Sequence, residues 1–202
     1  MNSGNSHNIA VTKKGDLYSW GRGDTGSLGL GYIEATQSTV DQETPYKIET
    51  VFDSKSVSSL ACGKTMSGAV MQSGTVYSWG KGAYERVRGD DYKEYSSPFV
   101  ILEQKHIVHT AFGSDHVLAL DRFGQLYTWG EGAMGALGLG DGKKRFVPTL
   151  MVFFEDKRVI DVSCGDQFTV VIAEIETEGK KENKVEIDVG IGSNSVKAII
   201  ER

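Results

Sequence analysis

The chain has 202 residues, of which 39% are hydrophobic and 24% are charged, so it has the composition of a globular domain with a real core. Its net charge of −5 argues against a protein that coats nucleic acid, because such chains are usually basic. No run approaches the ~18 consecutive apolar residues of a membrane-spanning helix. Residues 1–7 are polar and do not resemble a secretion signal.

The two cysteines, Cys62 and Cys164, do not have the spacing of a metal site. Without a secretion signal, free structural thiols are favoured over the alternative, a single disulfide. We therefore expect an intracellular protein that works in a reducing compartment.

One segment of seven residues occurs three times along the chain. Its copies are GDLYSWG at residues 15–21, GTVYSWG at 74–80 and GQLYTWG at 124–130. All three tryptophans of the protein, Trp20, Trp79 and Trp129, lie in this segment, 59 and 50 residues apart. Such internal periodicity indicates a repeat architecture.

A second recurring segment begins with glycine and lies upstream of each tryptophan. It reads GNSH at residues 4–7, GKTM at 63–66 and GSDH at 113–116, and a fourth copy, GDQF, stands at 165–168. In the first three copies its glycine precedes the tryptophan by 16 residues. This step is constant, whereas the distance from one unit to the next varies. The pattern therefore predicts rigid hairpins that are joined by loops of varying length. The only prolines, Pro45, Pro98 and Pro148, all fall between one hairpin and the next.

Each rigid unit is predicted to be two antiparallel strands around a tight turn. In the third unit the strands are 116–120 and 125–129, and Gly124 closes the turn because glycine reaches positive φ without steric cost. Gly15 and Gly74 occupy the same place. A further strand is predicted before each of the last three glycine-led segments, at 57–62, 107–112 and 159–164.

The first strand of each hairpin is nearly continuously apolar, which fits a strand covered on both faces. Its fourth position is small in three copies, as Ala10, Ala69 and Ala119, and is Val171 in the last, so adjacent sheets are expected to approach closely. Short sheets that repeat at about fifty residues are typical of propeller blades. An α-solenoid is excluded by glycine-dense stretches such as 130–140.

The last part of the chain differs in character. Residues 174–186 are rich in Glu and Lys and indicate a solvated connector, and 185–191 then alternate as a strand does. Asn194 or Ser195 is predicted to cap a short helix over 196–202. We therefore divide the chain into a repeat region, 1–173, and a charged connector with a strand and a short helix, 174–202. Two readings of the strand stay open, pairing with a blade of its own chain and docking onto a partner.

Residues 20–31, WGRGDTGSLGLG, resemble the signature of the regulator of chromosome condensation repeats, and residues 129–140 match it again. The flanking V-x-x-(V/L)-x-C-G element occurs at 57–63 and 159–165, and the resemblance covers about residues 4–173. It implies an all-β propeller, usually of seven blades. The family includes exchange factors for the nuclear GTPase Ran, ubiquitin-ligase adaptors, ciliary scaffolds and photoreceptors, so the fold alone does not fix the function.

The chain departs from the family pattern in three ways. It holds three complete units and the start of a fourth, so we expect an incomplete ring of about three to four blades, which a second copy or another protein completes. Glu85 and Arg88 stand where the first unit has Gly26 and Gly29. Met66 and Phe168 replace the histidine of the other two glycine-led segments. The missing blades put Ran exchange activity in doubt.

The resulting expectation is a non-enzymatic protein-interaction module that serves as a subunit or scaffold, without cofactor or metal. The alternatives are a guanine-nucleotide exchange regulator of a small GTPase and a chromatin-associated binding protein. We expect protein partners and allow for self-association, whereas membrane and nucleic-acid binding are disfavoured. A cytoplasmic, cytoskeletal or ciliary location is preferred over the nucleus on the breadth of the family alone.

Two segments are candidate contact sites for a partner. The long loop 83–95 combines the side-chain types that are enriched in interface hot spots. Its candidate residues are Tyr84, Arg86, Arg88, Tyr92 and Tyr95. The run Lys143-Lys144-Arg145 before Phe146 is the one dense basic segment, and it suits a phosphate or an acidic partner. Ordinary solvated loops remain the alternative for both segments.

Other patterns are interpreted structurally. The runs G-x-G-x-x-G at 21–26 and 130–135 fit a dinucleotide fingerprint, but Leu-Gly-x-Gly follows where a helix must begin. His106 and His109 lack a third metal ligand nearby, and the carboxylates Asp90 and Asp91 fit a solvated loop. His7 and His116 are expected to hydrogen-bond a local backbone group.

Overall fold

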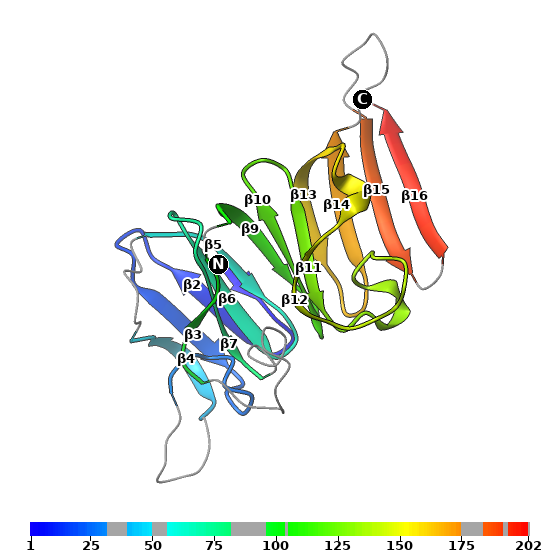
Figure 1. Cartoon of the computed structure of the whole chain (residues 1–202). Coiled ribbons are helices and arrows are strands. Elements are labelled where there is room, and N and C mark those ends of the chain that lie inside the picture. Colours follow the sequence, from blue (N-terminus) through cyan, green and yellow to red (C-terminus); the bar gives the residue numbers. More distant parts are fainter. Residues whose placement is uncertain are drawn as a thin grey trace.

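The computed structural model describes residues 1–31, 40–49, 56–81, 96–103 and 105–174, and the backbone of 184–191 and 194–201. These residues form four sheets, each of four strands. The sheets follow one another in chain order and stand side by side as an open arc (Figure 1). The all-β, propeller-type architecture predicted from the repeats is confirmed. We call the sheets blades 1 to 4 in chain order.

All strand pairs are antiparallel, and the strands of each blade are neighbours in sequence order. Blade 1 has β1 (Asn2–Ser3), β2 (His7–Val11), β3 (Leu17–Gly21) and β4 (Gln42–Lys47). Blade 2 has β5 (Val57–Cys62), β6 (Met66–Met71), β7 (Val76–Gly80) and β8 (Phe99–Leu102). Blade 3 has β9 (Ile107–Phe112), β10 (His116–Asp121), β11 (Leu126–Gly130) and β12 (Arg145–Leu150), with the 3-10 helices η2 (Ala133–Gly135) and η3 (Val152–Phe154). Blade 4 has β13 (Arg158–Cys164), β14 (Thr169–Glu174), β15 (Lys184–Ile191) and β16 (Asn194–Glu201).

The tight turns between the second and third strands lie where the repeats predict them. Gly15, Gly74 and Gly124 have φ values of 90°, 85° and 85°, in the left-handed region that favours glycine. In blade 3 the Asp121 carboxylate accepts hydrogen bonds from the main-chain N–H groups of Phe123 and Gln125, 2.8 and 2.9 Å away. The recurring glycine therefore follows from the turn geometry.

The three prolines lie at the outer edges of their blades. Pro45 is inside β4, Pro148 is inside β12, and Pro98 immediately precedes β8. In blades 1 and 3 the pairing of the outer strand is irregular around the proline, between Tyr46 and Gln42 and between Thr149 and Arg145. An edge strand tolerates proline because its outward N–H groups need no partner, and proline also discourages pairing with another chain.

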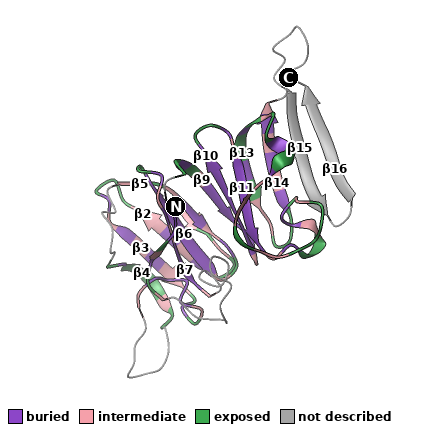
Figure 2. Cartoon of the chain, viewed as in Figure 1, coloured by how far each residue is buried: buried purple, intermediate pink, exposed green. Residues whose placement is uncertain are grey.

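The apolar core of the described residues is divided into three clusters, each between two consecutive blades. Figure 2 shows the buried residues on the strands where the sheets face one another. Between blades 1 and 2 lie Ile9, Leu17, Ile48, Leu60, Ala69 and Trp79. Between blades 2 and 3 lie Met66, Val70, Val76, Phe112, Val117, Ala119 and Trp129, among others. Between blades 3 and 4 lie Leu118, Leu120, Leu126, Phe154, Val162, Val171 and Ala173, among others. A blade therefore buries its apolar surface only against a neighbour.

Each blade has a leading face, toward the preceding blade, and a trailing face, toward the following one. Ala69 and Ala119 lie on leading faces and are 0% exposed, which confirms the close approach expected at this position. Trp79 and Trp129 are also 0% exposed, whereas Trp20, on the leading face of blade 1, is only half-buried. In blades 2 and 3 the preceding blade packs against this face.

The end of the chain corrects one prediction. Residues 194–201 form strand β16 and not the expected short helix. β15 pairs with β14, and β16 pairs with β15 in a register that sets Ile191 opposite Asn194. An isolated seven-residue helix would leave the edge of β15 unpaired, whereas the β-branched Val196, Ile199 and Ile200 suit a strand. The strand expected at 185–191 is confirmed, and it pairs with its own chain.

Candidate interaction surfaces

The four glycine-led turns, one from each blade, together line a hollow of about 410 Å³. In each turn the glycine N–H donates to the carbonyl of the residue three positions later, at 2.8 to 2.9 Å. The polar residues that line the hollow are Ser3, Asn5, Lys64, Ser114 and Asp166. The repeated turn therefore presents a different polar side chain from each blade to the same space.

Glycine is required in these turns because the blades approach closely. A Cβ on Gly63 would collide with the carbonyl oxygen of Gly113 in the next blade, and a Cβ on Gly4 would collide with that of Gly63. Neither glycine has a positive φ. In blades 1 and 2 the first glycine of the repeat is therefore set by contact between blades and not by the conformation of the turn.

His7 binds the next blade through its side chain. Its Nε2 lies 2.8 Å from the Ser67 hydroxyl, and that hydroxyl donates its proton to the main-chain oxygen of Ser27, also 2.8 Å away. A hydroxyl has one proton, so Nε2 carries the imidazole proton and donates it to Ser67. Burial lowers the pKa of His7 to about 4, so the ring is neutral at neutral pH.

The same contact recurs two blades later. Nε2 of His116 lies 3.2 Å from the Thr169 hydroxyl, which donates to the main-chain oxygen of Ala136 at 2.8 Å. The Nε2 contact of both histidines is thus with a hydroxyl side chain of the following blade. Their positions in the repeat are set by contact with the following blade.

The glycine loop, which follows the tryptophan and carries the family-like signature, packs onto the tryptophan of the next blade. The indole N–H of Trp79 donates to the main-chain oxygen of Ser27 at 2.8 Å. Gly29 lies flat against the same indole, since a Cβ there would stand 2.8 Å from its nitrogen. Residues 21–31 include the glycines that fit a dinucleotide fingerprint, but they contain no helix. The contacts of Ser27 and Gly29 with Trp79 show that this loop instead packs against the neighbouring blade.

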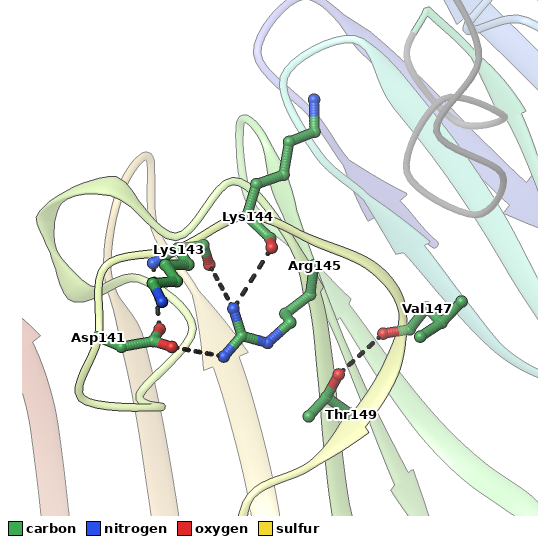
Figure 3. Close-up of polar contacts among 6 residues, drawn as sticks. All are labelled: Asp141, Lys143, Lys144, Arg145, Val147 and Thr149. Atoms are coloured by element: carbon green, nitrogen blue, oxygen red, sulfur yellow. Dashed lines mark hydrogen bonds and ion pairs between the residues drawn. The ribbon is translucent and has the colours of Figure 1, made fainter.

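The basic run of blade 3 is balanced by acidic groups of its own loop. Arg145 forms an ion pair with Asp141 at 2.7 Å, and Asp141 also accepts from the main-chain N–H of Lys143 at 3.1 Å (Figure 3). Lys144 forms an ion pair with Glu131 at 2.8 Å, and its ammonium lies 5.1 Å from the centre of the Phe146 ring. Local pairing weakens the attraction of this run for an acidic partner, and its role in binding stays a prediction.

The other candidate contact residues, Tyr84, Arg86, Arg88, Tyr92 and Tyr95, lie outside the described residues, as do Asp90 and Asp91.

The remaining candidate groups have structural surroundings. Nδ1 of His109 lies 3.2 Å from the Ser59 hydroxyl, and His106 stacks edge-on against Phe123. Cys62 and Cys164 are free, and burial raises the pKa of both thiols. Within the described residues, no cluster of three His, Cys, Asp or Glu side chains suits a metal ion. The described part also contains no helix of the length and apolar character needed to cross a membrane.

Comparison with known proteins agrees with the repeat pattern. The model of the regulator of chromosome condensation (RCC1) repeat matches residues 14–70, 73–120 and 124–172. The E3 ubiquitin-protein ligase HERC2 of Mus musculus is 33% identical over 189 residues, which are 88% of this chain and 4% of the ligase. The ultraviolet-B receptor UVR8 of Arabidopsis thaliana is 32% identical over 174 residues, which are 85% of this chain and 38% of the receptor.

Solved structures show the same architecture. Prp20p of Saccharomyces cerevisiae superimposes with a TM-score of 0.73 at 27% identity, over 87% of this chain and 43% of that one. Human WBSCR16 superimposes with a TM-score of 0.72 at 22% identity, over 98% of this chain and 50% of that one, and shows the fold alone. The chain thus spans half or less of the length of each of these proteins.

Proposed function

Since the chain belongs to the regulator of chromosome condensation repeat family, we propose that it is a non-enzymatic protein-interaction module within a larger assembly. The observation that carries the proposal is the leading face of blade 1. Its Trp20 is half-buried, whereas the equivalent tryptophans of blades 2 and 3 are 0% exposed beneath a neighbouring blade. A surface that carries the same aromatic residue as two buried interfaces is suited to binding protein.

Relatives support protein binding as the general activity. The structure of Prp20p is described with its binding to Gsp1p and histones, and yeast RCC1 (Prp20) has been solved with Kap60 bound. HERC2 is a ligase and UVR8 is a receptor, but this chain matches only 4% and 38% of their lengths. The proposal therefore takes from them the interaction role and not the activity of the whole protein.

The test is affinity purification from the native source with wild-type chain and with a variant that carries Trp20→Ser and Tyr18→Ser. Phe123→Ser serves as a matched control, because Phe123 is an exposed aromatic residue in a turn of blade 3. We expect the wild type and the control to retain the same proteins and the double variant to lose them. Equal retention by all three, with each variant folded by circular dichroism, would reject the leading face as the binding surface.

Regulation of a small GTPase is the second candidate, favoured by the likeness to Prp20p and its described binding to Gsp1p. A catalytic amount of the chain would then accelerate the release of labelled nucleotide from Gsp1p. Unchanged release at a tenfold excess over the GTPase would remove this candidate.

Chromatin association is the third candidate, since the structure of Prp20p is also described with histone binding. The net charge of −5 suits basic histones better than DNA. Salt-dependent retention on histones without retention on free DNA is the expected result. Imaging of the tagged chain tests the cytoplasmic, cytoskeletal or ciliary location against the nucleus.

A further inference from the structure

We propose that Thr44 is a phosphorylation site for a serine/threonine kinase that selects proline after the acceptor residue, and that Ser97 is not modified in the folded chain although it also precedes a proline. Phosphorylation of Thr44 is independent of the interaction role proposed above. The amino-acid sequence supplies both dipeptides, and the fold separates them.

The three prolines occupy one position of the repeat, in or beside the outermost strand of blades 1 to 3. The residues that follow them pair with equivalent residues of the third strand: Tyr46, Phe99 and Thr149 stand opposite Ser19, Ser78 and Thr128. The residues that precede the prolines are Thr44, Ser97 and Val147. A hydroxyl residue followed by proline therefore occurs twice at the same place in the repeat.

A hydroxyl residue followed by proline is a chemically distinct substrate. Proline has no main-chain N–H group, and it restricts the residue before it to extended conformations. A kinase that binds the acceptor segment as an extended peptide can enclose the next residue in a pocket without an acceptor for an N–H group. Any residue other than proline would bury that N–H group without a partner, which is unfavourable.

Thr44 and Pro45 lie in a stretch of β4 that is left out of the strand pairing. Gln42 pairs with Gly21 and Tyr46 pairs with Ser19, and the pairing is irregular between them. Residues 43–45, which include the dipeptide, are all exposed. A kinase can therefore contact the Thr44 hydroxyl and the proline ring without first separating β4 from β3.

The exposure of this position does not depend on what precedes blade 1. Blade 3 packs against blade 2 on one face and against blade 4 on the other. Its equivalent residues 146–148 are also left out of the pairing between β11 and β12. Val147, the equivalent of Thr44, is 61% exposed. The position is thus accessible at the rim of a blade that has neighbours on both sides.

Ser97 has the dipeptide but not the accessibility. Its hydroxyl residue is exposed, whereas Pro98, the ring that the kinase selects, is buried. The segment is also attached to the glycine loop of blade 1, because the Gly31 N–H donates to the main-chain oxygen of Ser96 at 2.8 Å. A Cβ on Gly31 would lie 3.7 Å from the Ser97 hydroxyl oxygen. Binding of this segment to a kinase would require Pro98 to leave the protein interior.

The reaction transfers one phosphoryl group from ATP. The Thr44 hydroxyl oxygen attacks the γ-phosphorus, and the bond from that phosphorus to the bridging oxygen of ADP breaks. A carboxylate of the kinase accepts the hydroxyl proton. The products are phosphothreonine at Thr44 and ADP.

The first test uses the full chain and a purified proline-directed kinase with Mg²⁺ and ATP. The kinase is chosen because it phosphorylates synthetic peptides of residues 40–49 and 93–102 at equal rates, so it accepts both dipeptides outside the fold. We expect the folded chain to gain one phosphoryl group, located at Thr44 by peptide mapping, while Ser97 stays unmodified. Thr44→Val is expected to abolish the gain, and Ser97→Ala is expected to leave it unchanged.

Two further substitutions separate the effect of the fold from that of the sequence. Ser97→Thr gives blade 2 the same dipeptide as blade 1 beside the buried Pro98. Val147→Thr places that dipeptide in the exposed, unpaired stretch of blade 3. We expect a second phosphoryl group on the blade 3 variant and none on the blade 2 variant. Circular dichroism and the unfolding temperature show that each variant is folded.

Pro45→Ala tests the selection of proline. The rate of phosphorylation of Thr44 is expected to fall by about tenfold or more, because alanine restores an N–H group for which the kinase pocket has no acceptor. The same substitution in the peptide of residues 40–49 measures the loss that is due to recognition alone. An unchanged rate in both would contradict selection by proline.

Equal modification of Thr44 and Ser97 in the folded chain would overturn the proposal. So would a Thr44 that stays unmodified in the chain while the peptide of residues 40–49 is phosphorylated. In protein purified from its native source with phosphatase inhibitors, we expect phosphate on Thr44 and not on Ser97. Phosphate on Ser97 alone, or on neither residue, would also overturn the proposal. None of these results depends on whether affinity purification finds a partner.

Discussion

The indole N–H of Trp79 donates a 2.8 Å hydrogen bond to the main-chain oxygen of Ser27 in the preceding blade. The indole nitrogen of Trp129 is equally buried, yet it has no hydrogen-bond partner in the part of the chain that the structure describes. The loop of blade 2 that corresponds to the Ser27 loop of blade 1, residues 82–95, lies outside the described residues.

Replacing these tryptophans by phenylalanine separates the hydrogen bond from ring packing. Trp79→Phe is expected to destabilise the protein by about 1 kcal/mol more than Trp129→Phe, because both lose ring volume and, among the described residues, only the first has a hydrogen bond to lose. Urea unfolding of the two variants gives the comparison. Equal losses of unfolding free energy would mean that the hydrogen bond to Ser27 makes no net contribution to stability.

The His7 interface can be converted to the apolar design found between blades 2 and 3. His7→Met and Ser67→Val are each expected to destabilise by roughly 1–3 kcal/mol, since each leaves a buried polar partner unpaired. The double variant reproduces the Met66–Val117 combination and is expected to recover at least ~1 kcal/mol of the summed losses. A double-mutant cycle by chemical denaturation measures this coupling, and strictly additive losses would show that the two side chains do not depend on each other.

Acid is expected to destabilise the protein through His7. The folded-state pKa is lowered to about 4 by burial, whereas the unfolded chain titrates near the ordinary value of 6.5. The unfolded state therefore binds more protons between these values, and stability that is present above pH 6.5 is lost as the pH falls toward 4. The loss attributable to this histidine is roughly 2–3 kcal/mol.

The double variant with His7→Met and Ser67→Val is the control for the pH dependence, because it has no ionisable group at this position. Unfolding free energies are compared between pH 7 and pH 4.5. A pH dependence as steep as that of the wild type would assign the acid sensitivity to other groups.

Gly63 tests the role of close contact between blades. Gly63→Ala is expected to destabilise by roughly 2 kcal/mol or more, because its Cβ would meet the Gly113 carbonyl of the next blade. Gly140→Ala is the control: its φ of 78° is unfavourable for alanine, but nothing lies within 4 Å of the added Cβ. There the loss is expected to be about 1 kcal/mol, from backbone conformation alone. Thermal unfolding ranks the two variants, and a larger loss at Gly140 would contradict the packing argument.

The hairpins were predictable because their information is local. The step of 16 residues from Gly4 to Trp20 recurs in the next two units, and it spans two strands and one turn whose geometry demands Gly15. The prolines were predicted only to fall between hairpins, and the structure places them in or beside outer strands, where a missing N–H is tolerated.

Contacts between blades were harder to predict because their partners belong to different repeats. His7 and Ser67 are 60 residues apart, and only the stacking of the sheets brings them together. A signal was nevertheless present: the glycine-led turn that ends in methionine, Met66, is followed one repeat later by Val117, whereas those that end in histidine are followed by Ser67 and Thr169. Comparing each repeat with the next, and not only with its equivalents, would have shown this pattern.

The wrong helix at the chain end has a similar cause. Asn194 and Ser195 are ordinary helix caps, and residues 196–202 have no strong preference by themselves. Pairing with the edge of β15 decides the conformation of this segment, because β16 pairs with β15 over eight residue pairs. Tertiary pairing overrides a weak local preference in a segment of this length.

The prolines at the rim limit the directions in which an assembly of such arcs can grow. Pro45 and Pro148 interrupt the outermost strands of blades 1 and 3, so a foreign strand that lies alongside them finds a broken ladder of hydrogen bonds. Lateral recruitment of extended peptides is thereby discouraged at these two rims. The circumferential direction, in which one whole sheet is laid upon another, does not meet this obstacle.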